Sequence, residues 1–331
     1  MPTTVPEAAI HVVAGLLERN DRIFLTRRPP GAHLAGKWEF PGGKLGAGES
    51  ALAGLVRELH EEIGIDVVQA SRFAQVRHTY PDKVILLDVW RVSAWRGEPH
   101  GREGQAARWS DPQTLRLDEL PQADWPIVRR LQLPRVYVIS DAQRLGRVRF
   151  LERLARLLRG GIRLVQLREP KLSQDDFAQL VSEVATLCRA HGARVLVNAD
   201  PQLASAWAVA GAHLNARRLM ATTVRPLDID QWVAASCHDE RELAQAGQIG
   251  VDFAVLSPVA TTASHPHAAP LGWKRFQQLV SEVSFPVFAL GGMQLSDLAT
   301  ARSHGAHGIA LIQGIWDETE PERFLQRLDG S

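Results

Sequence analysis

The stretch that decides the fold of the first part of the chain is GGKLGAGESALAGLVRELHEEIGI, residues 42–65. It carries Glu58, Glu61 and Glu62 at the spacing i, i+3 and i+4. If residues 49–63 form a helix, these side chains project from one face within a single turn. Like charges at this spacing destabilise a helix slightly, so the pattern indicates a positive partner between them. A solvated acidic helix face is the alternative interpretation.

Three converging carboxylates offer hard oxygen ligands of the kind that Mg²⁺ or Mn²⁺ prefers. Gly42 and Gly43 precede the expected helix and allow the backbone to approach a ligand closely. Arg57 can orient one of the carboxylates through a bidentate pair. The sequence therefore predicts a divalent-metal site on this helix.

Length and composition restrict the class of protein. The 331 residues suggest two domains, and 38 Lys and Arg against 37 Asp and Glu argue against binding a nucleic acid polymer. Cys188 and Cys237 are too few for a disulfide framework. The sequence shows neither a signal-peptide pattern nor an apolar run of membrane-spanning length. We expect a cytoplasmic protein with no membrane partner, and its oligomeric state stays open.

The chain changes its pattern near Pro134, so we expect domains at residues 1–132 and 133–331. The first part mixes β-runs, including a hairpin, with few helices, which is typical of an α+β fold. The second part alternates eight apolar strand-like runs with helical stretches. This count favours a (β/α)8 TIM barrel over the doubly wound sheet that is its structural competitor.

The spacing around the acidic helix leads to a family resemblance. The Nudix box is matched at every defined position: Gly43 is followed after five residues by Glu49, and after seven more by residues 57–65, RELHEEIGI. TRRPPGAHLAGKWEFPGGK and GEPHGREGQAARW extend the likeness, so residues 9–131 resemble a MutT-type Nudix hydrolase. The resemblance implies an α/β/α Nudix sandwich and Mg²⁺-dependent hydrolysis of a nucleoside triphosphate to the monophosphate and pyrophosphate. The usual MutT substrate is 8-oxo-dGTP.

The resemblance also assigns roles to residues of this chain. It implies the metal ligands Gly42 (through its carbonyl), Glu58, Glu61, Glu62 and Glu103. The implied catalytic residues are Arg57, Glu58, Glu61, Glu62 and Glu103, with the general base left open among the four glutamates. The implied substrate-binding residues are Arg28, His33, Phe40, Lys44 and Asp124. Four of these have an alternative interpretation without substrate. Arg28 and Lys44 could be ordinary surface charges, His33 a solvated loop residue and Phe40 a core residue.

Asp124 is where the sequence departs from the MutT pattern. It stands in LPQADWP at the place of an asparagine that reads the oxidised guanine. The 8-oxo base presents an N7–H donor beside the O6 acceptor, and an amide satisfies both. An ionised aspartate only accepts, whereas an aspartic acid kept neutral by burial could imitate the amide.

Residues 134–318 resemble the thiamine phosphate synthase and thiazole tautomerase (TenI-like) family. The likeness rests on LVQLRE, VLVNAD, SCHDERELAQA, SPVATTASHPHAAPLG and VFALGGM. It implies a phosphate site after the late strands and a pocket for a phosphorylated heterocycle. The candidate residues are Gln166, Arg168, Asn198, Ser236, His238, Thr262, Gly291, Gly292, Gln313 and Gly314.

The acidic residues with which synthases hold Mg²⁺ are misplaced in this chain. Asn198 is followed by Ala199, so that Asp200 comes one place late, and Arg218 aligns near the second acid. We therefore expect a degenerate synthase. Three interpretations stay open: a tautomerase with His238 as its acid–base residue, a ligand-binding module that senses its ligand, or a structural partner. A thiamine-pathway protein whose Nudix half cleaves a thiamine-related diphosphate is the rival function.

Overall fold

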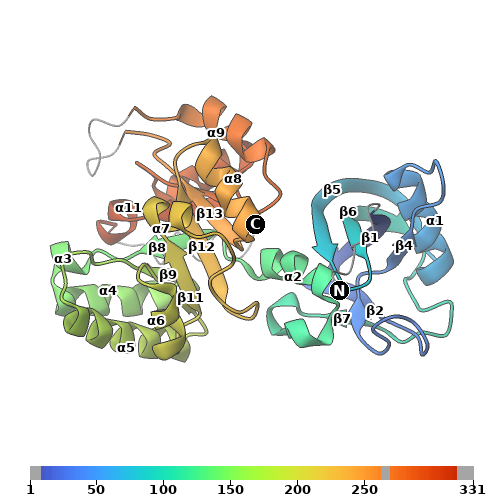
Figure 1. The fold of residues 1–331 in the computed structure, drawn as a ribbon, viewed down its shortest axis with the longest axis horizontal. Coiled ribbons are helices and arrows are strands. Elements are labelled where there is room, and N and C mark those ends of the chain that lie inside the picture. Colours follow the sequence, from blue (N-terminus) through green and yellow to red (C-terminus); the bar gives the residue numbers. More distant parts are fainter. Residues whose placement is uncertain (1–8, 262–268, 319–331) are drawn as a thin grey trace, which may run out of the picture. The chain divides into compact units, whose positions relative to one another are not determined.

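The computed structural model describes residues 9–261 and 269–318. The chain forms two compact units, residues 1–132 and 133–331 (Figure 1). Within the described ranges, no helix is both long enough and apolar enough to cross a membrane.

The first unit is built on a seven-stranded sheet with the order β3-β2-β1-β6-β5, to which β4 is added beside β1 and β7 beside β2. Its strands are β1 (Ile10–Arg19), β2 (Arg22–Arg27), β3 (Trp38–Glu39), β4 (Gly42–Lys44), β5 (Asp66–Thr79), β6 (Val84–Arg96) and β7 (Ala107–Ser110). Its helices are α1 (Ala51–Ile63) and α2 (Trp125–Gln132), with 3-10 turns η1 (Pro112–Thr114), η2 (Leu117–Glu119) and η3 (Gln122–Asp124). β1 and β2 form the expected hairpin, and β1 runs parallel to β6.

Helix α1 begins and ends at residues suited to those positions. The Ser50 hydroxyl accepts a hydrogen bond from the Ala53 N–H at 3.3 Å, and Gly64 ends the helix in the left-handed conformation at φ 73°. Leu55 and Leu59 are fully buried. This apolar face packs into a core cluster with residues of β1 and β6, so the carboxylates on α1 remain available.

The second unit is a closed parallel barrel of eight strands in the order β10-β11-β12-β13-β14-β15-β8-β9. The strands are β8 (Val136–Ile139), β9 (Leu164–Leu167), β10 (Arg194–Val197), β11 (Gly211–Leu214), β12 (Trp232–Cys237), β13 (Phe253–Leu256), β14 (Val287–Ala289) and β15 (Gly308–Leu311). Between and after them lie α3 (Ala142–Leu145), α4 (Arg147–Arg159), α5 (Gln174–Ala190), α6 (Pro201–Ala206), α7 (Ala216–Ala221), α8 (Glu240–Ile249), α9 (Gly272–Ser281), η4 (Leu295–Asp297), α10 (Leu298–Ser303) and α11 (Gln313–Trp316). The barrel prediction is confirmed, and all eight expected runs are strands.

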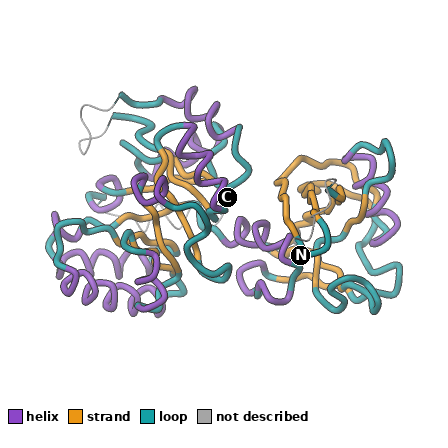
Figure 2. The backbone as a smooth tube through the Cα atoms, in the orientation of Figure 1, coloured by secondary structure: helices purple, strands orange, loops and turns teal. Residues whose placement is uncertain are grey.

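The barrel has an inner and an outer apolar layer. Residues such as Tyr137, Phe253 and Phe288 fill the interior, where their rings meet at centroid distances of 5.2–5.8 Å. A larger cluster lies between strands and helices, and Figure 2 shows the strands surrounded by helices. Because parallel strands bury both faces, the carboxyl ends of the strands and the loops after them are where a barrel presents polar side chains.

Candidate functional site

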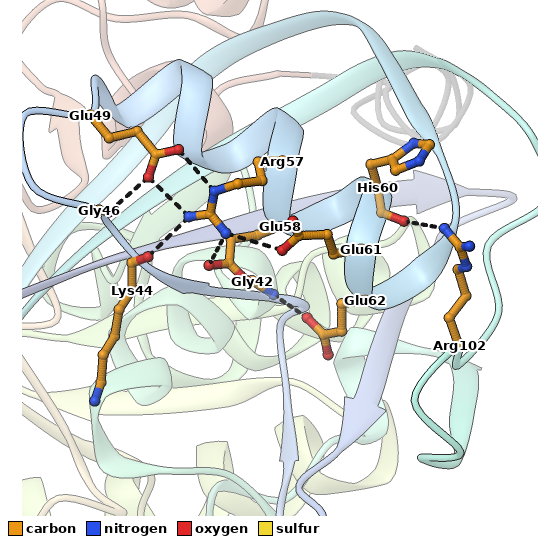
Figure 3. Close-up of polar contacts among 10 residues, drawn as sticks. All are labelled: Gly42, Lys44, Gly46, Glu49, Arg57, Glu58, His60, Glu61, Glu62 and Arg102. Carbon is orange, nitrogen blue, oxygen red and sulfur yellow. Dashed lines mark hydrogen bonds and ion pairs between the residues drawn. The ribbon is translucent and has the colours of Figure 1, made fainter.

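Arg57 lies at the centre of a cluster of carboxylates on α1 and just before it (Figure 3). Its Nε and Nη2 donate to the two Glu49 oxygens, each at 2.9 Å. Its Nη1 donates to Glu58 at 2.8 Å and to Glu61 at 3.1 Å, and Nη2 also reaches the Lys44 carbonyl at 3.2 Å. The guanidinium lowers the pKa of Glu49 to about 2. In the described structure Arg57 is thus the positive group between Glu49, Glu58 and Glu61, and a divalent metal between Glu58, Glu61 and Glu62 stays a prediction.

Glu62 points away from Arg57 and is held by other groups. Its Oε2 accepts from the Gly42 N–H at 2.6 Å, and its Oε1 accepts from the Thr26 hydroxyl at 2.8 Å. Burial raises the pKa of Glu62, and the negative charge of Glu103 raises it further. The structure thus brings Glu103, 41 residues farther along the chain, into electrostatic range of α1.

The glycines of β4 allow α1 to lie close to that strand. A Cβ at Gly43 would lie 2.3 Å from a Glu58 carboxylate oxygen, and one at Gly42 would lie 2.1 Å from the Val13 carbonyl. Gly42 also has a φ of 151°, which favours glycine. Any larger residue at 43 would displace the Glu58 carboxylate.

Among the described residues, no three His, Cys, Asp or Glu side chains are arranged to hold a metal ion. The reason is visible in the contacts above, since Glu58 and Glu61 share Arg57 while Glu62 turns to Gly42. The donors still fit a divalent cation chemically. They are carboxylate oxygens crowded on one face, and a cation would stabilise the ionised form of Glu62, whose pKa is raised by burial and by the charge of Glu103.

A second group of polar residues lies beside this cluster. Glu39 forms an ion pair with Arg28, whose Nε also donates to the His33 carbonyl at 2.6 Å. Burial raises the pKa of Glu39 to about 7, although Arg28 opposes the rise, and the charge of Glu62 adds to it. Arg28 is therefore engaged within the protein rather than lying free on its surface.

Asp124 is buried, with only 5% of its surface exposed, and its Oδ2 has no hydrogen-bond partner among the described residues. Burial raises its pKa well above the ordinary value, and the charge of Glu39 raises it further. Next to it, the Tyr80 hydroxyl accepts from the Ala123 N–H at 3.4 Å. Asp124 thus combines a carboxyl group whose pKa is raised with an oxygen that has no hydrogen-bond partner among the described residues, and its role in reading the base stays a prediction.

The other expected substrate-binding residues lie in different settings. Phe40 is 3% exposed and belongs to the core between the sheet and α2, and Trp38 packs against this core. The His33 ring meets Tyr80 edge to face at a centroid distance of 5.4 Å. Lys44 is exposed, and Figure 3 shows its side chain extending away from Arg57. Their contacts with substrate stay predictions.

In the barrel, a chain of hydrogen bonds links five side chains from five strands or strand ends. Asn198 Nδ2 donates to Gln166 Oε1, and Gln166 Nε2 donates to the Tyr137 hydroxyl, both at 3.2 Å. Tyr137 then contacts His213 Nδ1 at 3.1 Å, and His213 Nε2 contacts the Ser236 hydroxyl at 2.8 Å. Burial lowers the pKa of His213 to about 3, so the imidazole is neutral.

The remaining barrel residues fall near strand ends or outside the described part. His238 Nδ1 lies 2.8 Å from a Glu242 oxygen, and Arg168 is exposed after β9. Gly291 and Gly292 have φ of 102° and 69°, and a Cβ at either would lie 2.8 Å from a neighbouring backbone atom. Gln313 and Gly314 begin α11, and Thr262 lies outside the described residues.

Several residues that the structure places in these groups were not predicted from the sequence. They are Thr26, Glu39, Tyr80, Gln105, Tyr137 and His213. Gln105 links the acidic residues, because its Oε1 accepts from the Glu103 N–H at 2.8 Å and its Nε2 donates to the Glu62 carbonyl at 3.3 Å. Only His213, a histidine within an apolar strand run, stands out in the sequence afterwards.

Comparison with known proteins finds a family for each unit. The family model described as NUDIX domain matches residues 12–130, and the one described as Thiamine monophosphate synthase matches residues 136–315. The chain is 40% identical over 124 residues to the 8-oxo-dGTP diphosphatase of Escherichia coli, covering 37% of this chain and 96% of that protein.

The barrel has its own relatives. "Putative thiamine-phosphate synthase 2" of Aquifex aeolicus is 35% identical over 182 residues, 55% of this chain and 97% of that protein. A solved thiamine phosphate pyrophosphorylase from Pyrococcus furiosus matches with a TM-score of 0.50 and 21% identity, over 59% of this chain and 94% of that one. This last likeness shows the fold alone. The chain therefore belongs to the Nudix family, as a Nudix hydrolase, through residues 12–130, and to the thiamine monophosphate synthase family through residues 136–315.

Proposed function

We propose that the first unit hydrolyses 8-oxo-dGTP to 8-oxo-dGMP and pyrophosphate, and so removes an oxidised precursor before it enters DNA. The observation that carries the proposal is the carboxylate cluster that Arg57 organises on α1. The 40% identity to the E. coli 8-oxo-dGTP diphosphatase supports this choice of substrate.

Glu58, Glu61, Glu62 and Glu103, with the Gly42 carbonyl, would hold Mg²⁺ or Mn²⁺. A bound divalent metal neutralises charge on the phosphate oxygens and orients the attacking water. Arg57 holds Glu58 and Glu61 in place, and burial raises the pKa of Glu62. One glutamate of this set accepts the proton of the water.

Asp124 would read the base. As a neutral acid it has a hydroxyl donor for O6 and a carbonyl acceptor for N7–H, the same pair that an amide offers. Its burial and its unpartnered Oδ2 support this role. Guanine carries an acceptor at N7, so the same acid would pair less well with dGTP.

The rival function is cleavage of a thiamine-related diphosphate, which the fusion to a thiamine monophosphate synthase family barrel favours. The deciding measurement compares kcat/KM for 8-oxo-dGTP, dGTP and thiamine diphosphate with Mg²⁺, following the phosphate products. We expect preference for 8-oxo-dGTP and a loss of about 10²-fold or more in Glu61→Gln. Preference for thiamine diphosphate would replace the proposal by its rival.

For the barrel, we propose a degenerate synthase that binds a phosphorylated heterocycle without joining it to a second molecule. Asp200 Oδ1 accepts from the Gln202 N–H at 3.0 Å and caps α6, while Asn215 caps α7 in the same way. These caps support the proposal, because Asp200 is engaged at the start of a helix and Asn215 is not an acid. Thiamine phosphate binding without synthase turnover, measured by calorimetry and product analysis, is the expected result.

A further inference from the structure

The loop that joins β6 to β7, residues 97–106, is hydrogen-bonded to the last turn of α1. The carbonyl groups at the C-terminus of a helix have no partner inside the helix, so they accept bonds from other groups. Here the Ile63 carbonyl accepts from the His100 N–H at 3.1 Å, and the Glu62 carbonyl accepts from the Arg102 N–H at 3.0 Å. The main chain of the loop is therefore attached to the helix that carries the glutamates.

Arg102 makes a further bond to this helix end through its side chain (Figure 3). Its Nη1 donates to the His60 carbonyl at 2.9 Å. A cation at the C-terminus of a helix also interacts favourably with the helix dipole. Gly64 leaves the space that the arginine needs, because a Cβ there would lie 2.9 Å from Arg102 Cδ. Arg102 thus joins the loop to α1 by both its main chain and its side chain.

Glu103 lies in a tight turn of this loop, residues 101–105. The chain is so close to itself here that a Cβ at Gly101 would lie 2.0 Å from the Gln105 carbonyl oxygen. Gln105 connects the turn with α1, because its Oε1 accepts from the Glu103 N–H at 2.8 Å and its Nε2 donates to the Glu62 carbonyl at 3.3 Å. A continuous series of hydrogen bonds therefore leads from Glu103 to Glu62.

We propose that Arg102 and Gln105 are positioning residues that hold Glu103 at the glutamates of α1, for the binding of a divalent metal. A loop that is free to move has to be ordered each time a metal binds, and the lost entropy lowers the affinity. A loop that is already attached to α1 avoids most of this loss. The inference rests on the proposed function, in which Glu103 is one of the metal ligands.

The test measures Mn²⁺ binding to the full-length chain without nucleotide, from the electron paramagnetic resonance signal of the free ion. A second readout is the Mg²⁺ concentration that gives half-maximal hydrolysis of 8-oxo-dGTP. Arg102→Met removes the side-chain bond to α1 and the charge, and keeps a long side chain. We expect it to raise the Mn²⁺ Kd and the half-saturating Mg²⁺ concentration about 3–10-fold, the effect of losing one hydrogen bond.

Two further variants serve as controls for Arg102→Met. Arg102→Lys keeps the charge and a donor, so it should restore most of the metal affinity. Arg116→Met should leave the Mn²⁺ Kd unchanged, because Arg116 is exposed and pairs with Asp118, two residues away.

The double variant Arg102→Met/Glu103→Gln separates positioning of Glu103 from general support of the helix. Without the Glu103 carboxylate, the loss of the Arg102 side chain should leave the Mn²⁺ Kd equal to that of Glu103→Gln alone. Gln105→Ala breaks the second link between the turn and α1. It should weaken Mn²⁺ binding in the wild-type chain and have no effect in the Glu103→Gln background.

Two results would overturn the inference while leaving the proposed function intact. One is an Arg102→Met variant that binds Mn²⁺ as tightly as the wild-type chain, although Glu103→Gln binds it more weakly. The other is the same loss of affinity with and without the Glu103 carboxylate, because Arg102 would then support α1 as a whole. A Glu103→Gln variant with unchanged Mn²⁺ binding and unchanged hydrolysis would instead remove Glu103 from the proposed metal ligands.

Discussion

Arg57 joins three glutamates and one backbone carbonyl through three of its nitrogens. A lysine keeps the charge but offers one nitrogen in place of the planar fork, so it cannot hold Glu49 bidentately and also reach Glu58 and Glu61. We expect Arg57→Lys to lower kcat about 10–100-fold, the usual effect of losing a group that orients metal ligands.

The measurement for Arg57→Lys is a Mg²⁺ titration of kcat. Arg116→Lys is the matched control, because Arg116 is exposed and pairs with Asp118 only two residues away. Equal activity in the two variants would show that the fork is dispensable.

Asp124 gives a second prediction at this scale, on stability. Its folded pKa lies above the ordinary value of 3.8, so as the pH rises past about 4 the unfolded chain ionises while the folded carboxyl group stays neutral. Wild-type stability therefore falls relative to Asp124→Asn. We expect the difference in Tm to grow with pH by a few degrees, about the effect of 1 kcal/mol. A difference that is independent of pH would contradict the raised pKa.

Individual residues were predictable where spacing along one element determines proximity. Glu58, Glu61 and Glu62 needed only the helical period. Glu39 and Gln105 could not be found in this way, because strand pairing and a loop bring them to Glu62 from distant parts of the chain. Their residue types are also common on ordinary surfaces.

At the scale of elements, the approach of β4 to α1 depends on Gly43. A Cβ there would meet the Glu58 carboxylate at 2.3 Å, so Gly43→Ala should move that side chain and lower kcat/KM at least about tenfold. Gly48→Ala is the control, because Gly48 has a positive φ but nothing within 4 Å of its Cβ position. Because Gly43 itself has no positive φ, similar losses in both variants would show that activity responds to any change in this segment and not to the contact with Glu58.

The hydrogen-bond chain that crosses the barrel strands supplies another test. Tyr137→Phe leaves Gln166 Nε2 and His213 Nδ1 without the partner they share, and should cost about 1–3 kcal/mol of unfolding free energy. Denaturant unfolding followed by circular dichroism measures this loss. The chain's other tyrosine provides the control, because the hydrogen bond that the Tyr80 hydroxyl accepts within the described structure is long, at 3.4 Å. A smaller loss of unfolding free energy for Tyr137→Phe than for Tyr80→Phe would show that these hydrogen bonds do not stabilise the barrel.

Elements with a clear period were predictable and one long strand was not. The eight barrel strands are short buried runs between helices, and α1 has both of its caps in the sequence. β5 was missed because its 14 residues are mostly exposed or half-buried and polar, and register shifts interrupt its pairing with β6. Its strand conformation comes from that pairing rather than from its own pattern.

For the whole molecule, the apolar cores divide between the units. Two clusters lie within residues 1–132 and two within residues 133–331. We expect calorimetry of the full chain to show two transitions that ligands move separately. Mg²⁺ at about 100 times its Kd should stabilise one by about 2.7 kcal/mol, and inorganic phosphate should move only the other. A single transition that both ligands move would contradict this independence.

Closure of the barrel also has a consequence for synthesis on the ribosome. β15 completes the ring by pairing with β8, with Ile309 beside Val136, so the barrel cannot close until nearly the whole chain has emerged. The sheet of the first unit needs nothing beyond residue 110 for its strands, and α2 ends at Gln132. Because domains fold as they are translated, N-terminal first, the nascent chain should acquire a folded hydrolase while the barrel is still an open array of strands.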